Sequence, residues 1–477
     1  MIFLGIAMPN LQAQSLQSVV QQIAKDPGYR NGSIGISVRD VESNQLLYSY
    51  QDQKTMIPAS VLKILTISAA LEQLGPNYKF VTQCGYEGTI RTDGTLLGDF
   101  IIVGGGDPTM GSKYFGGERN LLNVFERIVQ KLGKKGITKI TGNLLIDISS
   151  YGADVQGHAW AQNDLGNYYG AGIFGLNVID NLFNIQFAQN QEPGSPVKLL
   201  QITPWLRHLQ IQNEVLTGPA SSGDQAYVFG SAWTNQVFIR GTIPPGAGNF
   251  TIKGAIPNPP QWFADSLLKY CQLKGIEIGG NAMVYGSSPQ ETKMKNLSVF
   301  DTLQSPALSD IIRIANVESV NLFCEAMLLA MDRSPENGIS RFDGIEYVYS
   351  WMAANKIDTV GLFYQDGSGL SPRNGITANQ LAQVLAVSAK KYGSKFEDYF
   401  AQAGSEGTVK NLLKASPHKS HFKVKSGSMD RVRNYAGFVH TDKGKWLSYS
   451  ILLNDFTAKG SQTTRNVEEI LEAINKL

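Results

Sequence analysis

Residues 57–66 read IPASVLKILT, which places Ser60 and Lys63 three positions apart between a proline and an apolar run. A helix is expected over 60–74, because a proline precedes it and Gly-Pro follows it. Residues i and i+3 share one helix face, so a lysine amine there can reach the serine hydroxyl and act as its base once burial lowers the lysine pKa. The alternative, equally open from this stretch alone, is a capping serine with a lysine that extends to solvent.

The spacing S-x-x-K is weak evidence by itself, because it recurs elsewhere in the chain. Ser60 differs from the other serines in its surroundings. It lies at an expected helix start, where outward-facing N–H groups can hold an oxyanion, and apolar neighbours would desolvate the lysine. The same spacing occurs without this context at Ser195, Ser266, Ser388, Ser416 and Ser420.

Two further motifs follow in order along the chain. The only S-x-N is Ser319-Val320-Asn321, expected between two helices, and the only K-[S/T]-G is Lys425-Ser426-Gly427, expected at the end of a strand. Each tripeptide alone more often marks a turn than a site. The order S-x-x-K, S-x-N, K-S-G is what favours one catalytic set.

With these motifs the chain resembles the penicillin-recognising serine D,D-peptidases. Within them it is most similar to the low-molecular-mass class C penicillin-binding proteins, the D-alanyl-D-alanine carboxypeptidases/endopeptidases. The long interval between the first two motifs supports this, because that group places extra domains there. Three more stretches carry the resemblance: GGGDP at 104–108, WAQNDL at 160–165 and DGSGLS at 366–371.

The resemblance implies catalytic roles for five residues. Ser60 would attack the D-Ala-D-Ala carbonyl and form an acyl-enzyme, and Lys63 would accept its proton. Ser319 would relay a proton to the leaving amine, and Asn321 would hold the substrate amide. Lys425 would supply positive potential.

Substrate binding is implied for four further positions. Ser426, where the family more often has threonine, would bind the terminal carboxylate beside Gly427. The N–H of Ser428 would form the oxyanion hole together with that of Ser60. Asp164 would face the amine-bearing side chain of the peptidoglycan stem peptide; a structural turn aspartate is the open alternative.

The pattern of strands and helices indicates one sheet assembled from both ends of the chain. Strands are expected at 33–38, 46–50, 422–425, 435–440 and 447–453, and helices at 308–315, 320–331, 344–355 and 378–392. The fold class is α+β: the resemblance implies a penicillin-recognising serine peptidase (β-lactamase-like) core, an antiparallel sheet flanked by helices, with inserted mainly-β domains. The core is expected from 14–82 and 290–477 and the insertion from 83–289, with a smaller inner β domain at about 150–260.

Composition excludes several classes of protein. The chain has 477 residues with a formal net charge of +2 and no long basic run, which argues against nucleic acid as a partner. Residues 1–13 are expected to be the remnant of a secretory signal peptide, the alternative being a merely apolar terminus. A periplasmic location follows from that expectation, with or without peripheral attachment to a membrane.

Cysteine and histidine usage points away from disulfides and metals. Three cysteines, an odd number, exclude a full disulfide framework. A Cys84–Cys271 bridge stays open, but buried free thiols are favoured. There is no H-E-x-x-H motif, so no metal site is predicted, and no cofactor is needed because nucleophile, base and oxyanion hole are all protein groups.

Peptidoglycan stem peptides as substrates and β-lactams as covalent inhibitors are the partners that the resemblance implies. A β-lactamase or an esterase could use the same apparatus, although these enzymes usually lack the long insertion. A non-catalytic cell-wall-binding protein is the alternative from another class. A Ser-His-Asp hydrolase is disfavoured, because the G-x-S-x-G motif is missing.

Overall fold

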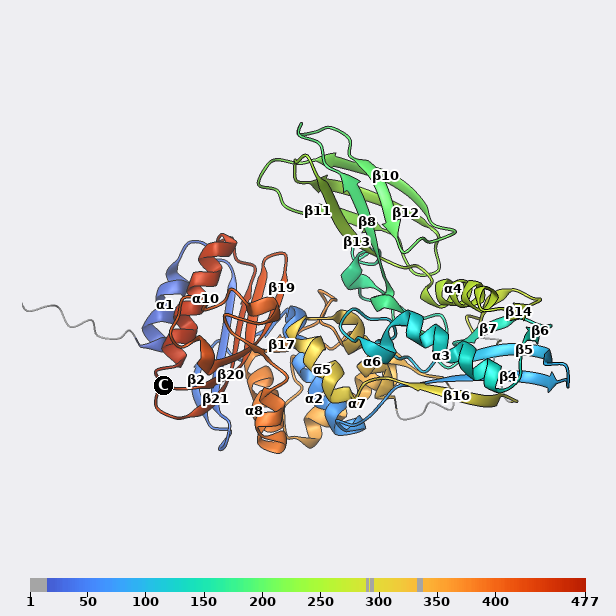
Figure 1. Ribbon diagram of the computed structural model, residues 1–477. Coiled ribbons are helices and arrows are strands. Elements are labelled where there is room, and N and C mark those ends of the chain that lie inside the picture. Colours follow the sequence, from blue (N-terminus) through green and yellow to red (C-terminus); the bar gives the residue numbers. More distant parts are fainter. Residues whose placement is uncertain (1–14, 289–290, 292–295, 333–337) are drawn as a thin grey trace, which may run out of the picture. The chain divides into compact units, whose positions relative to one another are not determined.

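The computed structural model describes residues 15–288, 291, 296–332 and 338–477 (Figure 1). The chain divides into two compact units, residues 1–61 with 376–477, and residues 62–375. The expected signal remnant at 1–13 lies outside the described residues. The domain limits at 82/83 and 289/290 stay a prediction, and the second of them also falls on residues outside the described part.

The first unit is built on a six-stranded antiparallel sheet of order β18-β19-β20-β21-β1-β2. Strand β1 (Ser33–Asp40) pairs along its whole length with β21 (Trp446–Asn454), so both ends of the chain form one sheet, as expected. The register joins Ile36 to Ile451. The remaining strands are β2 (Leu46–Tyr50), β18 (Ala401–Gln402), β19 (Phe422–Met429) and β20 (Val432–His440).

Helices cover both faces of this sheet (Figure 1). Helix α8 (Ala378–Tyr392) packs on β1 and β21, and on the opposite face α1 (Leu16–Lys25) packs against α10 (Gly460–Ile474). Eight of the nine residues of β21 are buried, as expected of a strand covered on both sides. The expected antiparallel sheet flanked by helices is confirmed. The minor elements are β3 (Thr55–Met56), paired with β17 (Ile376–Thr377), and the short helix α9 (Ser394–Glu397).

One buried asparagine fixes the segment that leads to Ser60. The Asn434 side chain is fully buried; its Nδ2 donates to the carbonyls of Ile57 at 2.9 Å and Pro58 at 2.8 Å. Its Oδ1 accepts the N–H of Leu453 at 2.9 Å. Backbone groups that leave a sheet need such partners, because burying them unpaired is costly.

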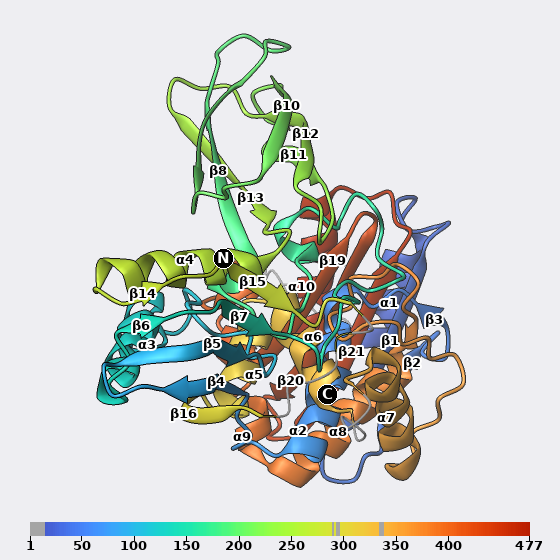
Figure 2. The same cartoon turned by 90° about the vertical axis from the view of Figure 1, so that its right-hand side faces the viewer.

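The second unit contains a mixed sheet of order β14-β6-β5-β4-β16, in which β7 also pairs with β5 and β15 pairs with β7 (Figure 2). Its core includes Cys84 of strand β4 and Cys271 of helix α4. All three cysteines of the chain are buried and free, which confirms the favoured expectation, and burial raises the pKa of both thiols in this core to about 12. The elements are β4 (Val81–Ile90), β5 (Thr95–Val103), α3 (Leu121–Lys134), β6 (Lys139–Ile140), β7 (Leu144–Asp147), α4 (Pro259–Leu273), β14 (Glu277–Ile278), β15 (Ala282–Tyr285) and β16 (Ser298–Gln304).

Two three-stranded sheets form a smaller β domain within this unit and project from it (Figure 1). They have the orders β10-β12-β11 and β13-β8-β9 and share an apolar core that includes Phe183, Phe187 and Ile239. The inserted β structure that the sequence predicts is therefore present. The strands are β8 (Leu182–Ala188), β9 (Lys198–Thr203), β10 (Gln210–Thr217), β11 (Gln225–Phe229), β12 (Gln236–Ile243) and β13 (Asn249–Ala255).

A group of helices completes the second unit. Helix α2 (Lys63–Leu74) packs against α5 (Leu308–Val317), α6 (Asn321–Ala330) and α7 (Arg341–Ala354). The first nine residues of α2 are all buried, which its apolar sequence allows. Within the described residues, no helix is both long and apolar enough to cross a bilayer.

Two expectations about helices need correction. The helix expected over 60–74 is α-helical only from Lys63; a 3₁₀ turn, η1 (Ala59–Leu62), precedes it, and Ser60 is not its capping residue. Helix α4 lies in a region that was expected to be β structure. Its start signal is the Asn258 cap followed by prolines in the first turn, and this signal was overlooked.

We expect Asn434→Ala to lower the free energy of unfolding by about 2–4 kcal/mol, because it leaves several buried backbone groups without partners. Urea unfolding followed by circular dichroism measures this. Asn411→Ala, at an exposed position, is the control and should change the midpoint little. Equal midpoints for the two variants would contradict the role given to Asn434.

Candidate active site

Ser60 lies in the 3₁₀ turn η1, directly after a residue with left-handed backbone. Ala59 has φ +47°, a conformation that costs a non-glycine residue free energy and is often found at functional sites. Strand β19 lies against this turn. A Cβ added at Gly427 would lie 2.8 Å from the Pro58 oxygen and 2.9 Å from the Ser60 nitrogen. Glycine at 427 is therefore what lets the strand backbone approach the amide of Ser60.

The K-S-G motif occupies the middle of β19. Lys425 is fully buried, and its Nζ donates to the carbonyl of Ser426 at 2.6 Å. The hydroxyl of Ser426 lies 2.7 Å from that of Thr408. Ser428 is exposed. Ser60, Gly427 and the rest of the K-S-G motif thus belong to the first compact unit.

Lys63 is the first residue of α2 and is fully buried. Its Nζ donates to Asn321 Oδ1 at 2.6 Å and to the carbonyl of Ser368 at 2.6 Å. Burial lowers the pKa of this amine from its ordinary 10.5, while Asp366 and Glu325 nearby oppose that shift. A side chain that extends to solvent, the alternative from the sequence, is therefore wrong for Lys63.

The S-x-N motif forms the junction between α5 and α6. Ser319 has φ +58°, a second left-handed non-glycine residue beside a predicted catalytic group. This turn lets α6 begin at Asn321, whose Oδ1 accepts from Lys63 and whose Nδ2 donates to the carbonyl of Tyr169 at 2.8 Å. The structure therefore brings the S-x-N motif and the lysine of S-x-x-K together within the second unit.

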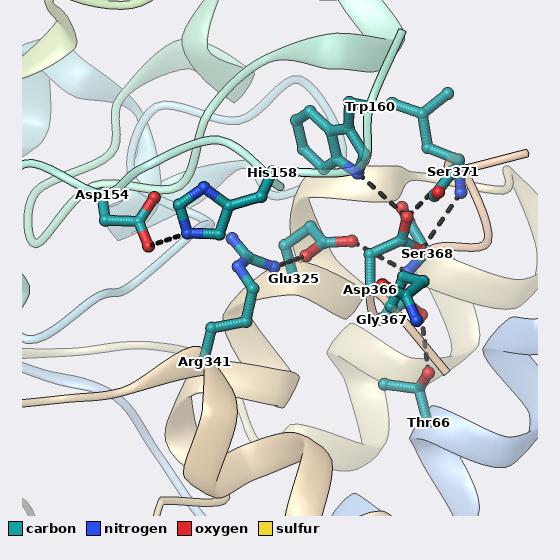
Figure 3. Close-up of polar contacts among 12 residues, drawn as sticks. Thr66, Asp154, His158, Trp160, Glu325, Arg341, Asp366, Gly367, Ser368 and Ser371 are labelled. Carbon is teal, nitrogen blue, oxygen red and sulfur yellow. Dashed lines mark hydrogen bonds and ion pairs between the residues drawn. The ribbon is translucent and has the colours of Figure 1, made fainter. Parts of the chain in front are cut away.

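A loop of the insertion, residues 159–169, contacts this region at two further points. The indole N–H of Trp160 donates to Asp366 at 2.9 Å (Figure 3). The Ser371 hydroxyl donates to the Ala159 carbonyl at 2.8 Å. Trp160 is 7% exposed, so its polar atom is used internally. With the Asn321–Tyr169 bond, the loop is fixed at three places.

Asp366 organises the stretch DGSGLS. Its two carboxylate oxygens accept the N–H groups of Gly369 at 2.7 Å, Leu370 at 3.2 Å and Ser371 at 2.7 Å, besides the indole of Trp160 (Figure 3). The loop therefore turns around one buried charge, and this orients the Ser368 carbonyl that holds Lys63.

A buried ion pair supports the same loop from the other side. Glu325 on α6 is fully buried; it pairs with Arg341 of α7 and accepts the N–H of Ser368 at 2.9 Å (Figure 3). Burial raises the pKa of Glu325, and the Arg341 guanidinium opposes that shift. The sequence analysis missed both residues; the one signal was an acidic side chain within the otherwise apolar face of LFCEAML.

Asp164 lies in the insertion loop, half-buried and hydrogen-bonded to the Tyr169 side chain. Burial raises the pKa of Asp164, and the bond from Tyr169 opposes that shift. Its backbone also closes a turn, since the Asn167 N–H donates to the Asp164 carbonyl at 3.0 Å. A binding role for Asp164 stays a prediction, as do the catalytic and binding roles of the motif residues.

We expect Glu325→Gln to lower the free energy of unfolding by about 3–5 kcal/mol, because it leaves the buried Arg341 without a counter-charge. Equilibrium urea unfolding measures this. The matched control is the double variant Glu325→Gln with Arg341→Met, which should recover part of the loss because neither buried charge remains. If the double variant is less stable than the single one, the ion pair is not the cause.

The fold and sequence can be compared with known proteins. A crystal structure of penicillin binding protein 4 from Haemophilus influenzae matches with a TM-score of 0.81 and 22% identity, covering 97% of this chain and 99% of that one. This similarity confirms the predicted fold. A predatory peptidoglycan endopeptidase from Bdellovibrio bacteriovorus matches at a TM-score of 0.50 and 15% identity, with 93% and 92% covered.

Sequence relatives and a family profile agree with this. The D-alanyl-D-alanine carboxypeptidase DacB of Haemophilus influenzae is 23% identical over 464 residues, 96% of this chain and 91% of that protein. A D-alanyl-D-alanine carboxypeptidase of an Actinomadura species is 22% identical over 92% of this chain and 81% of its own length. The profile of the D-Ala-D-Ala carboxypeptidase 3 (S13) family matches residues 16–475. The chain therefore belongs to the D-Ala-D-Ala carboxypeptidase 3 (S13) family and is a serine-type D-alanyl-D-alanine carboxypeptidase.

Proposed function

We propose that this carboxypeptidase cleaves D-Ala-D-Ala and crosslinking bonds of peptidoglycan stem peptides in the periplasm, through an acyl-enzyme on Ser60. The observation that carries the proposal is the environment of Lys63. A buried amine three residues after a serine, held by two oxygen acceptors and with a lowered pKa, has the properties of a general base.

The hydrogen bonds of Lys63 suit the neutral amine. A neutral amine has two N–H bonds and one lone pair. In that form the two N–H bonds can serve Asn321 and the Ser368 carbonyl, and the lone pair is the group that would accept the proton of Ser60. Since burial lowers the pKa of Lys63, its uncharged form is more populated at any given pH than that of an exposed lysine.

The proposed acylation conserves atoms and charge. The Ser60 oxygen bonds to the carbonyl carbon while its proton passes to Lys63. The C–N bond then breaks as Ser319 delivers its proton to the leaving amine and receives in return the proton held by Lys63. Water then hydrolyses the ester. The N–H groups of Ser60 and Ser428 would stabilise the oxyanion, since backbone donors fixed in place act without reorganisation.

The K-S-G strand would bind the free carboxylate of the substrate. Lys425 would supply positive potential from its buried position, and the hydroxyl of Ser426 would provide a donor beside it. In an endopeptidase reaction the same strand would meet the carboxylate end of a crosslinked second peptide. Asp164 would meet the amine-bearing side chain of the stem peptide.

β-Lactams are the proposed covalent inhibitors. The penicillin binding protein 4 of Haemophilus influenzae has been crystallised with a β-lactam, and a Bdellovibrio endopeptidase has been crystallised acylated by penicillin G. Two other functions compete with this proposal. One is a β-lactamase or an esterase that uses the same catalytic residues, and the other is a non-catalytic protein that binds the cell wall.

We expect intact-mass analysis to find one penicillin bound after brief exposure to benzylpenicillin, and no adduct on Ser60→Ala. Ser420→Ala, an exposed serine in another S-x-x-K pattern, is the matched control and should keep the adduct. Rapid loss of penicillin without an adduct would indicate a β-lactamase. Neither adduct nor turnover would favour the non-catalytic protein.

The acylation rate should rise with pH through the pKa of Lys63, because only the neutral amine accepts the proton of Ser60. Since burial lowers that pKa, the midpoint should lie below the ordinary lysine pKa of about 10.4. Stopped-flow acylation by a chromogenic cephalosporin measures the profile. Lys63→Met should lose about 10²–10⁴-fold in rate together with the pH dependence.

The control for that profile is Lys414→Met, which removes an exposed lysine and should leave both rate and midpoint unchanged. A pH-independent acylation rate in the unsubstituted protein would contradict the role of Lys63 as base.

A further inference from the structure

A cavity of about 450 Å³ lies between the smaller β domain and the loop 159–169, wholly within the second unit. Three segments line it: the turn at 167–169, the start of β11 at 224–227, and β13 at 251–253. Its volume is in the usual range for small-molecule sites. The lining of this cavity contains no residue of the S-x-x-K, S-x-N or K-S-G motif.

The wall of the cavity is fixed by Asn167. Its side chain accepts the N–H of Val228 at 2.9 Å and donates to the Asn163 carbonyl at 2.7 Å, and its backbone pairs with Gly254. Asn167 is 4% exposed. The turn, β11 and β13 are therefore joined at one buried residue, so the cavity is formed before any ligand binds.

Two tyrosines give the cavity exposed aromatic surface. Tyr168 is 55% exposed and Tyr227 is 39% exposed. The ring of Tyr168 packs edge-on against that of Tyr169, with 5.1 Å between centroids, which limits its motion. Ring faces held open to solvent suit a ligand with flat apolar C–H faces, as pyranose sugars have.

The polar lining carries both signs of charge. Asp224 and Lys253 line the cavity together with Thr251. Asp224 Oδ1 accepts the Ala226 N–H at 3.1 Å, and no salt bridge to Asp224 occurs among the described residues. Opposite charges with hydroxyl and amide neighbours favour a neutral ligand with many hydroxyl groups over a net anion or cation.

The turn that lines the cavity also contacts Asn321 of the candidate active site. Tyr168 immediately precedes Tyr169, whose carbonyl accepts the Nδ2 of Asn321 at 2.8 Å. A substrate with a sugar attached to its peptide could therefore contact both places in one binding event. We propose that the cavity is a subsite for an N-acetylated amino sugar of the glycan strand that carries the stem peptide; this rests on the function proposed above.

The test compares one peptide with and without its sugars. Tyr168→Ala, Tyr227→Ala and Asp224→Asn are assayed for D-alanine release from a disaccharide pentapeptide and from the sugar-free pentapeptide. The KM for the disaccharide substrate should rise about tenfold, while kcat/KM for the sugar-free peptide stays unchanged. Trp205→Ala, which removes a 68% exposed aromatic outside the cavity lining, is the matched control.

Binding of a peptide-free tetrasaccharide to Ser60→Ala, followed by ligand-observed NMR, tests the cavity without catalysis. Binding that Tyr168→Ala abolishes supports the subsite even if the proposed reaction fails. Equal KM changes for both substrates would assign the cavity to peptide and overturn the proposal. Unchanged KM values with active enzyme, or no glycan binding, would overturn it as well.

Discussion

The described structure depends most on the burial of one amine. Lys63 is the first residue of α2 and is fully buried, so its ammonium form cannot be stabilised by water. Two oxygen acceptors are held against it instead, one on α6 and one in the loop 366–371. The positions of Asn321 and Ser368 are therefore linked to a single nitrogen atom, and most of the other polar contacts nearby serve to hold these two acceptors.

Two buried carboxylates hold that arrangement from behind. Asp366 fixes the loop through backbone N–H groups, and Glu325 fixes Ser368 through one N–H while its other oxygen pairs with Arg341. Each charge is costly to bury alone and acceptable because it is fully hydrogen-bonded. The arrangement gives Lys63 rigid surroundings, and burial lowers its pKa although Asp366 and Glu325 nearby oppose that shift.

Much of the core could be predicted from the sequence because it follows from local patterns. Alternating or continuous apolar runs predicted β1, β2 and the three C-terminal strands. The helix expected over 378–392 coincides with α8, which Thr377 caps at its start and Gly393 ends. Helix α4 was missed because its start, Asn258 followed by two prolines, looks like a turn until the following residues are known to be packed.

The site could be predicted only as far as its motifs. Ser60, Lys63 and Asn321 were predicted from the order of the motifs and from the family resemblance that these carry, and both depend on linear properties of the chain. Glu325, Arg341 and the Trp160–Asp366 bond depend on contacts between segments far apart in the chain, and no short pattern encodes those. The left-handed backbone at Ala59 and Ser319 was also beyond reach, because neither residue type favours it.

The three contacts of loop 159–169 have a consequence for how this chain could be recombined. They join the insertion to Asn321, Asp366 and Ser371, so the loop supplies partners for groups that lie outside the insertion. The insertion is therefore not a modular appendage that can be excised or exchanged at its sequence boundaries. A chimaera that keeps the lysine environment intact must treat this loop as part of the catalytic domain and place its junctions beyond it.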